Sequence, residues 1–140
     1  MSEAHRTFYD QGLKIRCEVA GHEHVKRSLR TGSSDFARPM QELATEVGWG
    51  MVWARPGLDR KTRSLLNIAM LSCLNRSTEL AVHVRGAINN GATDVEIRET
   101  LMQVAIYCGM PAGLEGIRVA EGVLKAIRAE QETEVSSQEK

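Results

Sequence analysis

Apolar residues recur at intervals of three and four positions along most of the chain, a spacing that predicts amphipathic helices. Runs that alternate between apolar and polar residues, as strands do, are missing from the sequence. Six helices are expected, over about residues 7–19, 35–53, 59–74, 77–90, 93–109 and 111–129. The pattern therefore predicts an all-α fold, a single-domain bundle of about six helices.

Residues that favour helix ends mark several of these boundaries. Asp59 is a suitable N-cap for "LDRKTRSLLNIAMLSCLN", which is apolar almost all round and predicts a central helix. Asn90–Gly91 fits a left-handed C-terminal cap, and Thr93 with Glu96 fits a capping box for the next helix. Pro111 stands at the first-turn position that proline favours. These signals separate the last four expected helices from one another.

The length and composition predict one compact domain over residues 1–130. The chain has 140 residues, 42% of them hydrophobic, which suits one core and is too few residues for two. The last segment, "EQETEVSSQEK", is almost entirely polar, so residues 131–140 are expected to form a disordered tail. The pattern leaves open whether the first helix joins the core.

Charge and hydrophobicity argue against two classes of protein. The 18 basic and 18 acidic residues balance and no basic block stands out, so binding to nucleic acid is not expected. The most apolar stretches, "LLNIAML" and "LMQVAIYCGM", are far shorter than the roughly 18 residues that indicate a membrane-spanning helix. The N-terminus lacks the charged-then-apolar pattern of a secretion signal, so we expect a cytoplasmic protein.

The cysteines and histidines show no metal or disulfide pattern. Cys17, Cys73 and Cys108 are odd in number and irregularly spaced, which favours buried free thiols over a disulfide framework. The three histidines near the N-terminus lack the spacing of a metal-binding motif. No metal site is expected.

The stretch "STELAVHVRGAINNG" places Glu79 and His83 four residues apart on one expected helix. At about 100° per residue, both side chains fall on a stripe beside the apolar face, at the boundary of the core. A solvated pair of this kind contributes only ~0.2–0.5 kcal/mol and implies no function. Taken alone, such a pair is more often a surface or core-edge feature, and proton transfer is the competing interpretation.

Three other features suit a ligand site. Arg63 belongs to a basic first turn of a helix, which is most often solvated, although cations are unfavourable there and an anionic partner is one alternative. Arg85 points about 160° away from His83, toward solvent or a neighbouring subunit. The alternating tryptophan and methionine residues of "GWGMVWARPG" could line a pocket, although a packed hydrophobic helix end also explains them.

Three segments taken together resemble the carboxymuconolactone decarboxylase family. They are "YDQGLKIRCEVAGHEHV", "GWGMVWARPGLDRKTRSLLNIAML" and "ELAVHVRGAINNGATDVEIRETLMQVAIYCGMPAG". The resemblance runs from about Tyr9 to Leu124 and is most specific at residues 55–58, 62–65, 83–85, 90–91 and 105–109. It implies an alkylhydroperoxidase-like helical fold that assembles into trimers or hexamers, with active sites between helices and at subunit contacts.

The resemblance also implies a reaction and a set of site residues. The family's decarboxylase acts on 4-carboxymuconolactone in aromatic compound catabolism without metal or organic cofactor, and decarboxylase-like members carry Glu and His at the positions of Glu79 and His83. Both are therefore the expected catalytic residues, because decarboxylation needs an electron sink and a proton returned to carbon. The expected substrate-binding residues are Arg118, Arg63, Arg85, Trp49, Met51, Trp53 and Tyr107.

Alkylhydroperoxidase-like members of the family carry Cys-x-x-Cys-x-x-x-His instead. The histidine of that motif falls on His83, but its two cysteine positions hold Arg76 and Glu79. Thiol peroxidase activity is therefore not expected.

Two departures from the decarboxylase pattern leave the reaction open. Met51 stands where the family usually has an acid, and Arg118 stands where a second histidine is usual. The leading prediction is a cofactor-independent lyase that decarboxylates an anionic, 4-carboxymuconolactone-like lactone or a related unsaturated acid. The alternatives are isomerisation or hydration of another unsaturated ring acid, and a non-catalytic oligomeric protein that binds acids.

Overall fold

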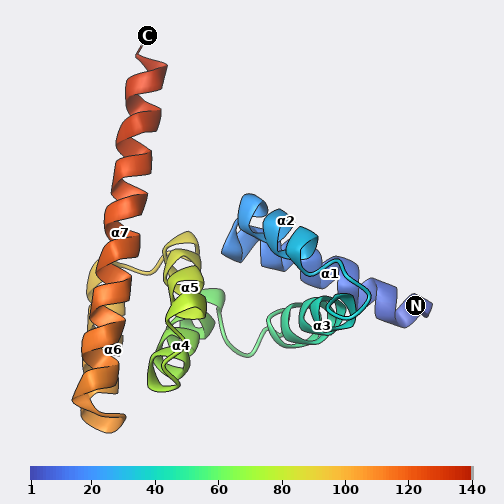
Figure 1. Ribbon diagram of the computed structural model, residues 1–140, viewed down its shortest axis with the longest axis horizontal. Coiled ribbons are helices and arrows are strands. Elements are labelled where there is room, and N and C mark those ends of the chain that lie inside the picture. Colours follow the sequence, from blue (N-terminus) through green and yellow to red (C-terminus); the bar gives the residue numbers. More distant parts are fainter. Residues whose placement is uncertain (140) are drawn as a thin grey trace. The chain divides into compact units, whose positions relative to one another are not determined.

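The structure, a computed structural model, describes residues 1–139 and consists of helices joined by short turns, without a strand in that range (Figure 1). The all-α class predicted from the sequence is confirmed. The contacts within the chain group into two compact units, Met1–Arg63 and the part from Ser64 onward. Two units form because each half of the chain buries apolar side chains of its own.

The first unit contains α1 (Glu3–Ala20), α2 (His22–Thr31), α3 (Arg38–Leu43) and the π-helix η1 (Ala44–Val52). Helix α1 contributes the buried side chains of Ile15 and Val19 to the core of the first unit. Helix α2 was not expected, because its sequence, "HEHVKRSLRT", is strongly polar and only Val25 in it is buried. The helix expected over residues 35–53 is present as α3 followed by η1.

Two glycines allow the backbones of α1 and η1 to touch. A methyl group on Gly12 would lie 2.0 Å from the carbonyl oxygen of Thr45, and one on Gly50 would lie 2.1 Å from the carbonyl oxygen of Phe8. No side chain fits at either position. The π-helical turn, which is rare in proteins, occurs where this contact is made.

Arg16 connects the elements of the first unit from inside. Its buried guanidinium donates to Oγ1 of Thr45 at 2.9 Å, to Oγ of Ser28 at 3.0 Å and to Oε1 of Gln41 at 3.0 Å. These acceptors lie on η1, α2 and α3. Burial lowers the pKa of Arg16 from its ordinary value, and the three hydrogen bonds offset the cost of burying the cation.

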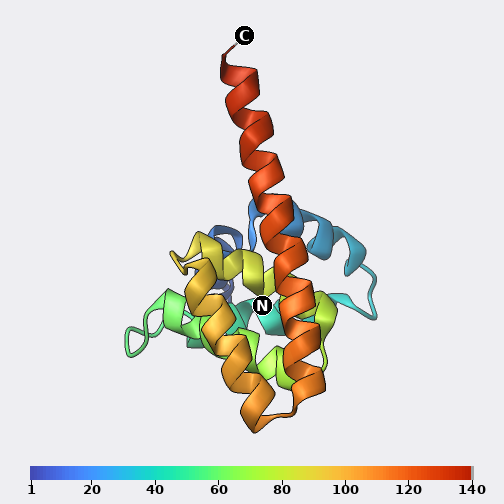
Figure 2. The ribbon, with the colours of Figure 1, turned by 90° about the vertical axis from the view of Figure 1, so that its left-hand side faces the viewer.

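The second unit contains α5 (Ser77–Asn89), α6 (Asp94–Tyr107), α7 (Met110–Gln138) and all but the first turn of α4 (Arg60–Cys73). Helices α6 and α7 run antiparallel, side by side (Figures 1 and 2). The expected end signals are confirmed. Asp59 Oδ1 accepts a hydrogen bond from the amide of Thr62 at 2.7 Å, and Gly91 has a φ of 88°. Thr93 and Glu96 form the capping box of α6, and Pro111 stands in the first turn of α7.

Helix α7 continues to Gln138, so residues 131–138 are helical where a disordered tail was expected. The hydroxyls of Thr133, Ser136 and Ser137 each donate to the backbone carbonyl four residues earlier. Glutamate and glutamine, which are strong helix formers, make up four of these eight residues, so backbone propensity helps to extend the helix without a core to pack on. Residue 140, the last of the expected tail, lies outside the described residues.

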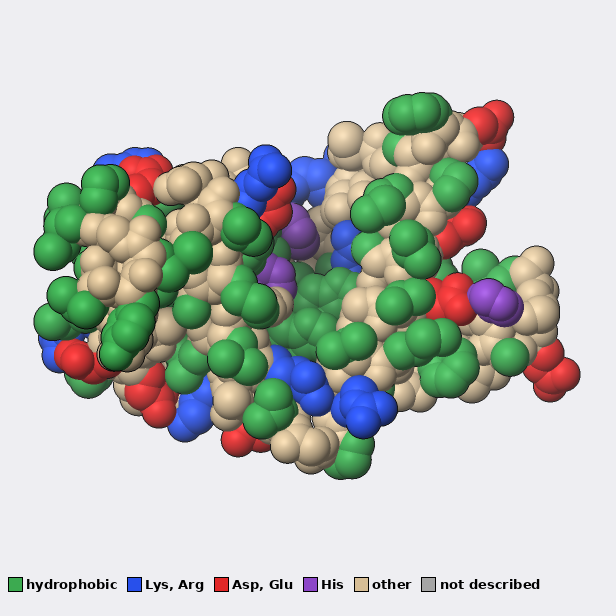
Figure 3. All heavy atoms as spheres, turned by 90° about the horizontal axis from the view of Figure 1, so that it is seen from below, with side chains coloured by type: hydrophobic (Ala, Val, Ile, Leu, Met, Phe, Trp, Pro, Cys, Tyr) green, Lys and Arg blue, Asp and Glu red, His purple; other side chains and the backbone are tan. Residues whose placement is uncertain are grey.

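Large apolar side chains remain exposed on α6 and α7. Figure 3 shows hydrophobic side chains spread over this part of the surface, on the left of the view. Among them, Ile106 is 74% exposed, Tyr107 79% and Leu114 64%. Within residues 1–139, no helix combines the length and apolar character that crossing a membrane requires.

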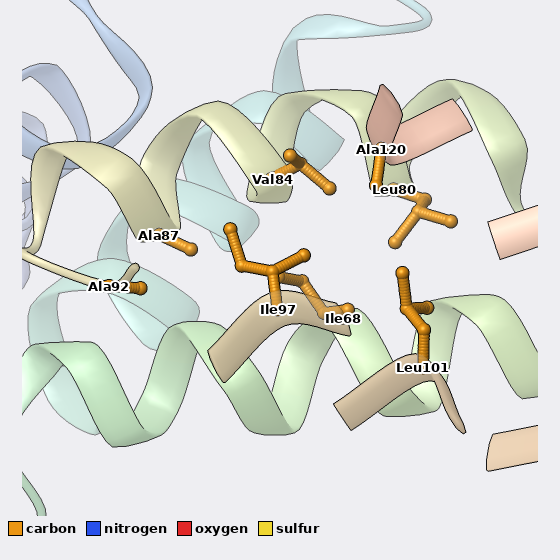
Figure 4. Packing of buried hydrophobic residues seen from close by; sticks show 8 residues of the cluster. All are labelled: Ile68, Leu80, Val84, Ala87, Ala92, Ile97, Leu101 and Ala120. Atoms are coloured by element: carbon orange, nitrogen blue, oxygen red, sulfur yellow. The ribbon is translucent and has the colours of Figure 1, made fainter. Parts of the chain in front are cut away.

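The core of the second unit is formed by aliphatic side chains from all four of its helices (Figure 4). Ile68 of α4, Leu80 and Val84 of α5, and Ile97 and Leu101 of α6 are each at most 1% exposed. Each of these burials stabilises the unit by about 1.5–3 kcal/mol. This core fixes the face that α5 turns toward its neighbours.

Candidate functional site

Polar side chains form two contacts between α4 and α5, beside the core of the second unit. Nδ2 of Asn67 lies 3.4 Å from Nδ1 of His83, and Nδ2 of Asn90 donates to Oγ of Ser64 at 2.9 Å. Ser64 is fully buried, whereas Asn67, His83 and Asn90 are half-buried. His83 thus lies at the core boundary, as its helical position predicts. Glu79 lies one turn earlier on α5 and is exposed.

Arg85 and Arg118 line one open groove of about 430 Å³ between α5 and α7. Arg85 donates two hydrogen bonds to Glu130, at 2.8 and 3.0 Å, and Arg118 donates two to Glu115, at 2.8 and 2.6 Å. Each arginine therefore has a carboxylate partner inside its own unit. His83 does not line this groove, so the structure groups the two arginines with each other rather than with the imidazole.

Glu115, the partner of Arg118, has a carboxyl group with a strongly lowered pKa. Its hydrogen bonds from Arg118 and from the hydroxyl of Ser77 lower its pKa from 4.5 to about 2. Between about pH 4.5 and pH 2 the unfolded chain therefore takes up a proton that the folded chain does not. The stabilisation by this carboxylate is complete above that range and is lost as the pH falls through it.

Glu115→Gln is therefore expected to lower the thermal midpoint at pH 6 and to have a smaller effect at pH 2.5. Thermal unfolding followed by circular dichroism at both pH values measures this difference. Glu121→Gln, which removes a single exposed ion pair with Lys125, serves as the control. An effect of Glu115→Gln that is equal at the two pH values would contradict the assignment.

Four of the expected substrate-binding residues belong to the first unit: Trp49, Met51, Trp53 and Arg63. The rings of Trp49 and Trp53 stack with their centroids 4.8 Å apart. Arg63 donates from Nη2 to the carbonyl oxygen of Arg55 at 3.1 Å, and its buried Nε has no hydrogen-bond partner within the described chain. A buried donor without an acceptor costs about 1–3 kcal/mol, so this side of the guanidinium is suited to bind an anionic oxygen.

Two further polar residues, Asn67 and Glu46, were not predicted as site residues from the sequence. Asn67 interrupts the apolar run "LLNIAML", a signal that could have been found. Glu46, on η1, is buried, and its Oε1 lies 2.6 Å from Nδ1 of His5. The acid inside "ATEVGWGMVW" is visible in the sequence, but its partner on α1 is defined only by the packing of the two helices.

The cysteines differ from the expectation of buried thiols. All three are free, Cys17 is half-buried, and Cys73 and Cys108 are exposed because they stand at helix ends. Across residues 1–139, no group of three or more His, Cys, Asp or Glu side chains is arranged to hold a metal ion.

Comparisons with known proteins agree with the resemblance in the sequence. The model of the carboxymuconolactone decarboxylase family matches residues 38–122. The nitrosuccinic acid decarboxylase of Metarhizium robertsii is 49% identical over 119 residues, which are 85% of this chain and 82% of that protein. The 4-carboxymuconolactone decarboxylase of Acinetobacter baylyi is 44% identical over 117 residues, which are 84% of this chain and 87% of that protein.

An uncharacterized 15.0 kDa protein of Paracoccus denitrificans is 36% identical over 133 residues, which are 88% of this chain and 95% of that protein. The two characterised relatives are both decarboxylases, which supports a carboxy-lyase activity for this chain. The family match covers well over half of the sequence, including His83 and Asn67. This chain belongs to the carboxymuconolactone decarboxylase family.

Proposed function

We propose that this protein removes CO2 from a succinate that carries an electron-withdrawing group on carbon 2. The substrates named for the two decarboxylase relatives have this unit in common. In nitrosuccinic acid the group is a nitro group, and in 4-carboxymuconolactone it is the unsaturated lactone ring. In both molecules one carbon carries this group, the departing carboxylate and a CH2-carboxylate arm.

The chemistry of this unit explains why no metal or organic cofactor is part of the proposal. Loss of CO2 breaks a carbon–carbon bond and leaves its electron pair on carbon 2, where the nitro group or the lactone takes up the charge. One proton must then be added, so the balance is R–COO⁻ + H⁺ → R–H + CO2. The protein has to hold the dianion, stabilise the developing charge and deliver that proton.

The contact between Asn67 and His83 is the observation that carries the proposed mechanism. When the amide of Asn67 donates to Nδ1, the proton of the neutral imidazole lies on Nε2. The proton that we propose His83 to deliver leaves Nε2 of the imidazolium form, in which Nδ1 donates to the amide oxygen of Asn67 instead, so that a neutral ring remains and no imidazolate forms. Glu79, exposed one turn earlier on α5, either orients the imidazole or resupplies the proton.

Arg63 is the candidate arginine best suited to hold the carboxylate that remains on the substrate. Arg85 and Arg118 already pair with glutamates. Arg63 donates to a backbone carbonyl oxygen, and its buried Nε has no hydrogen-bond acceptor among the described residues. A carboxylate oxygen at this atom would restore the missing hydrogen bond, which is stronger when both groups are charged.

Assembly into a trimer or hexamer is part of the same proposal. Ile106, Tyr107 and Leu114 expose most of their apolar surface on α6 and α7. Contiguous exposed apolar surface commonly marks a site of protein association. Subunit contacts at these helices would cover it.

The test is an assay of CO2 release from three compounds: 2-nitrosuccinate, 4-carboxymuconolactone and unsubstituted succinate. We expect turnover of at least one of the first two and none of succinate, which has no electron sink on carbon 2. The product mass separates the alternatives, because hydration adds water and isomerisation leaves the mass unchanged. Saturable binding of both acids without any product would instead favour the acid-binding protein.

The same assay tests the role of Arg63. Arg63→Met is expected to raise KM more than it lowers kcat, because it removes a contact present in the bound substrate and the transition state alike. Arg118→Met serves as the comparison and should change KM less. Light scattering on the same samples reports whether the variants keep the assembly of the wild type.

A further inference from the structure

Cys73 and Cys108 are far apart in the sequence and adjacent in the second unit. Cys73 is the last residue of α4 and Cys108 caps the end of α6, and their thiols are close enough for Cys73 to raise the pKa of Cys108. A second contact lies next to this one, because Oγ of Ser72, the neighbour of Cys73, donates at 2.9 Å to the carbonyl oxygen of Ala112 in the first turn of α7, four residues after Cys108. The close approach of the thiols therefore follows from helix packing.

Both thiols are exposed in the single chain and stand where the backbone can adjust. Both residues are exposed, and each precedes a turn that contains a residue with positive φ, Asn75 at 58° and Gly109 at 110°. Forming a disulfide requires its two Cα atoms to be about 4.4–6.8 Å apart, and helix ends accommodate small adjustments better than helix interiors. Cys17, by contrast, is half-buried on α1 in the other unit.

We propose that Cys73 and Cys108 form a dithiol site that a hydroperoxide oxidises reversibly to an intramolecular disulfide. This site does not include the proposed catalytic residues His83 and Glu79, and the proposal does not depend on the decarboxylase activity. It also differs from a Cys-x-x-Cys motif, because one sulfur comes from the end of α4 and the other from the end of α6.

The oxidation proceeds in two balanced steps. The thiolate of Cys73 attacks one peroxide oxygen, the O–O bond breaks and Cys73 becomes a sulfenic acid, while the alkoxide takes up the proton that the thiol released and leaves as ROH. Cys108 then attacks the sulfenyl sulfur, the S–O bond breaks, and water leaves as the S–S bond forms. Cys73 is assigned the first attack because the hydrogen bond with Cys73 raises the pKa of Cys108, which keeps Cys108 protonated.

Mapping of tryptic peptides from the oxidised full-length protein tests this proposal. After treatment with hydrogen peroxide and alkylation of the remaining thiols, the peptides Ser64–Arg76 and Glu99–Arg118 should appear as one disulfide-linked species. Dithiothreitol should separate them, and a non-reducing gel should show a single-chain band. The peptide that contains Cys17, residues 17–26, should carry the alkylating group and is the internal control.

Serine variants provide the matched comparison. Oxidation of the wild type should raise the thermal midpoint, because the new bond closes a loop over residues 74–107 in the unfolded chain. Cys17→Ser should keep that shift, whereas Cys73→Ser and Cys108→Ser should each abolish it. Sulfinic acids without a linked peptide, or linkage only between two chains on the gel, would overturn the proposal.

Discussion

Replacing His83 with alanine is expected to lower kcat on the accepted substrate by a factor on the order of 10²–10⁴, the range for a positioned general acid or base. The imidazole is the half-buried group in contact with Asn67, and the proposed reaction requires one proton at carbon. His83 lies at the boundary of the core rather than within it, so we expect the fold to be retained. Steady-state kinetics and circular dichroism on the purified variant measure both effects.

Three further variants separate the roles around His83. Asn67→Ala should lower kcat less than His83→Ala does, and it should have no further effect in the His83→Ala background, because the two residues act as one unit. Glu79→Gln should lower kcat only slightly if the carboxylate orients the ring. It should lower kcat about as much as His83→Ala does if the carboxylate resupplies the proton. Near-wild-type turnover by His83→Ala would show that His83 is not catalytic.

Replacing Gly12 with alanine is expected to destabilise the first unit by at least about 1–3 kcal/mol, the usual cost of forcing extra atoms into packed structure. The new methyl group would lie 2.0 Å from the carbonyl oxygen of Thr45 and 2.7 Å from the amide nitrogen of Gly50. Both are backbone atoms, so no change of side-chain rotamer can relieve the overlap. Helices α1 and η1 must separate to accommodate it.

Tryptophan fluorescence measures this effect in the first unit alone. The chain has two tryptophans, and both Trp49 and Trp53 belong to that unit. The urea midpoint from fluorescence should fall for Gly12→Ala. Gly48→Ala is the matched control, because its methyl group meets no atom within 4 Å and alanine favours a helix over glycine by about 1 kcal/mol. Equal midpoints for Gly12→Ala and the wild type would contradict the described contact.

The candidate site was predictable in part. The position of His83 at the core boundary follows from helical periodicity, because residues three and four apart share one face of a helix. Its contact with Asn67 was not predictable, since it depends on how α4 is rotated against α5. For the same reason, the sequence placed Arg63, Arg85 and Arg118 in one set, whereas the structure gives two of them carboxylate partners.

The sequence by itself determined the helical class, the ends of the later helices and membership of the family. These features rest on interactions within a few residues, such as the capping box of Thr93 and Glu96, or on segments that can be compared letter by letter. Helix α2 was missed because its sequence is strongly polar on average and only one of its side chains, that of Val25, is buried.

Tertiary structure alone decided which distant residues meet. The contact of Cys73 with Cys108, the pairing of His5 with Glu46 and the approach of Gly12 to Thr45 each join different helices. Local propensity fixes where a helix begins and ends, but its neighbour and its rotation are set by the burial of side chains over the whole unit. The spacing of two residues in the chain therefore does not reveal whether their side chains touch.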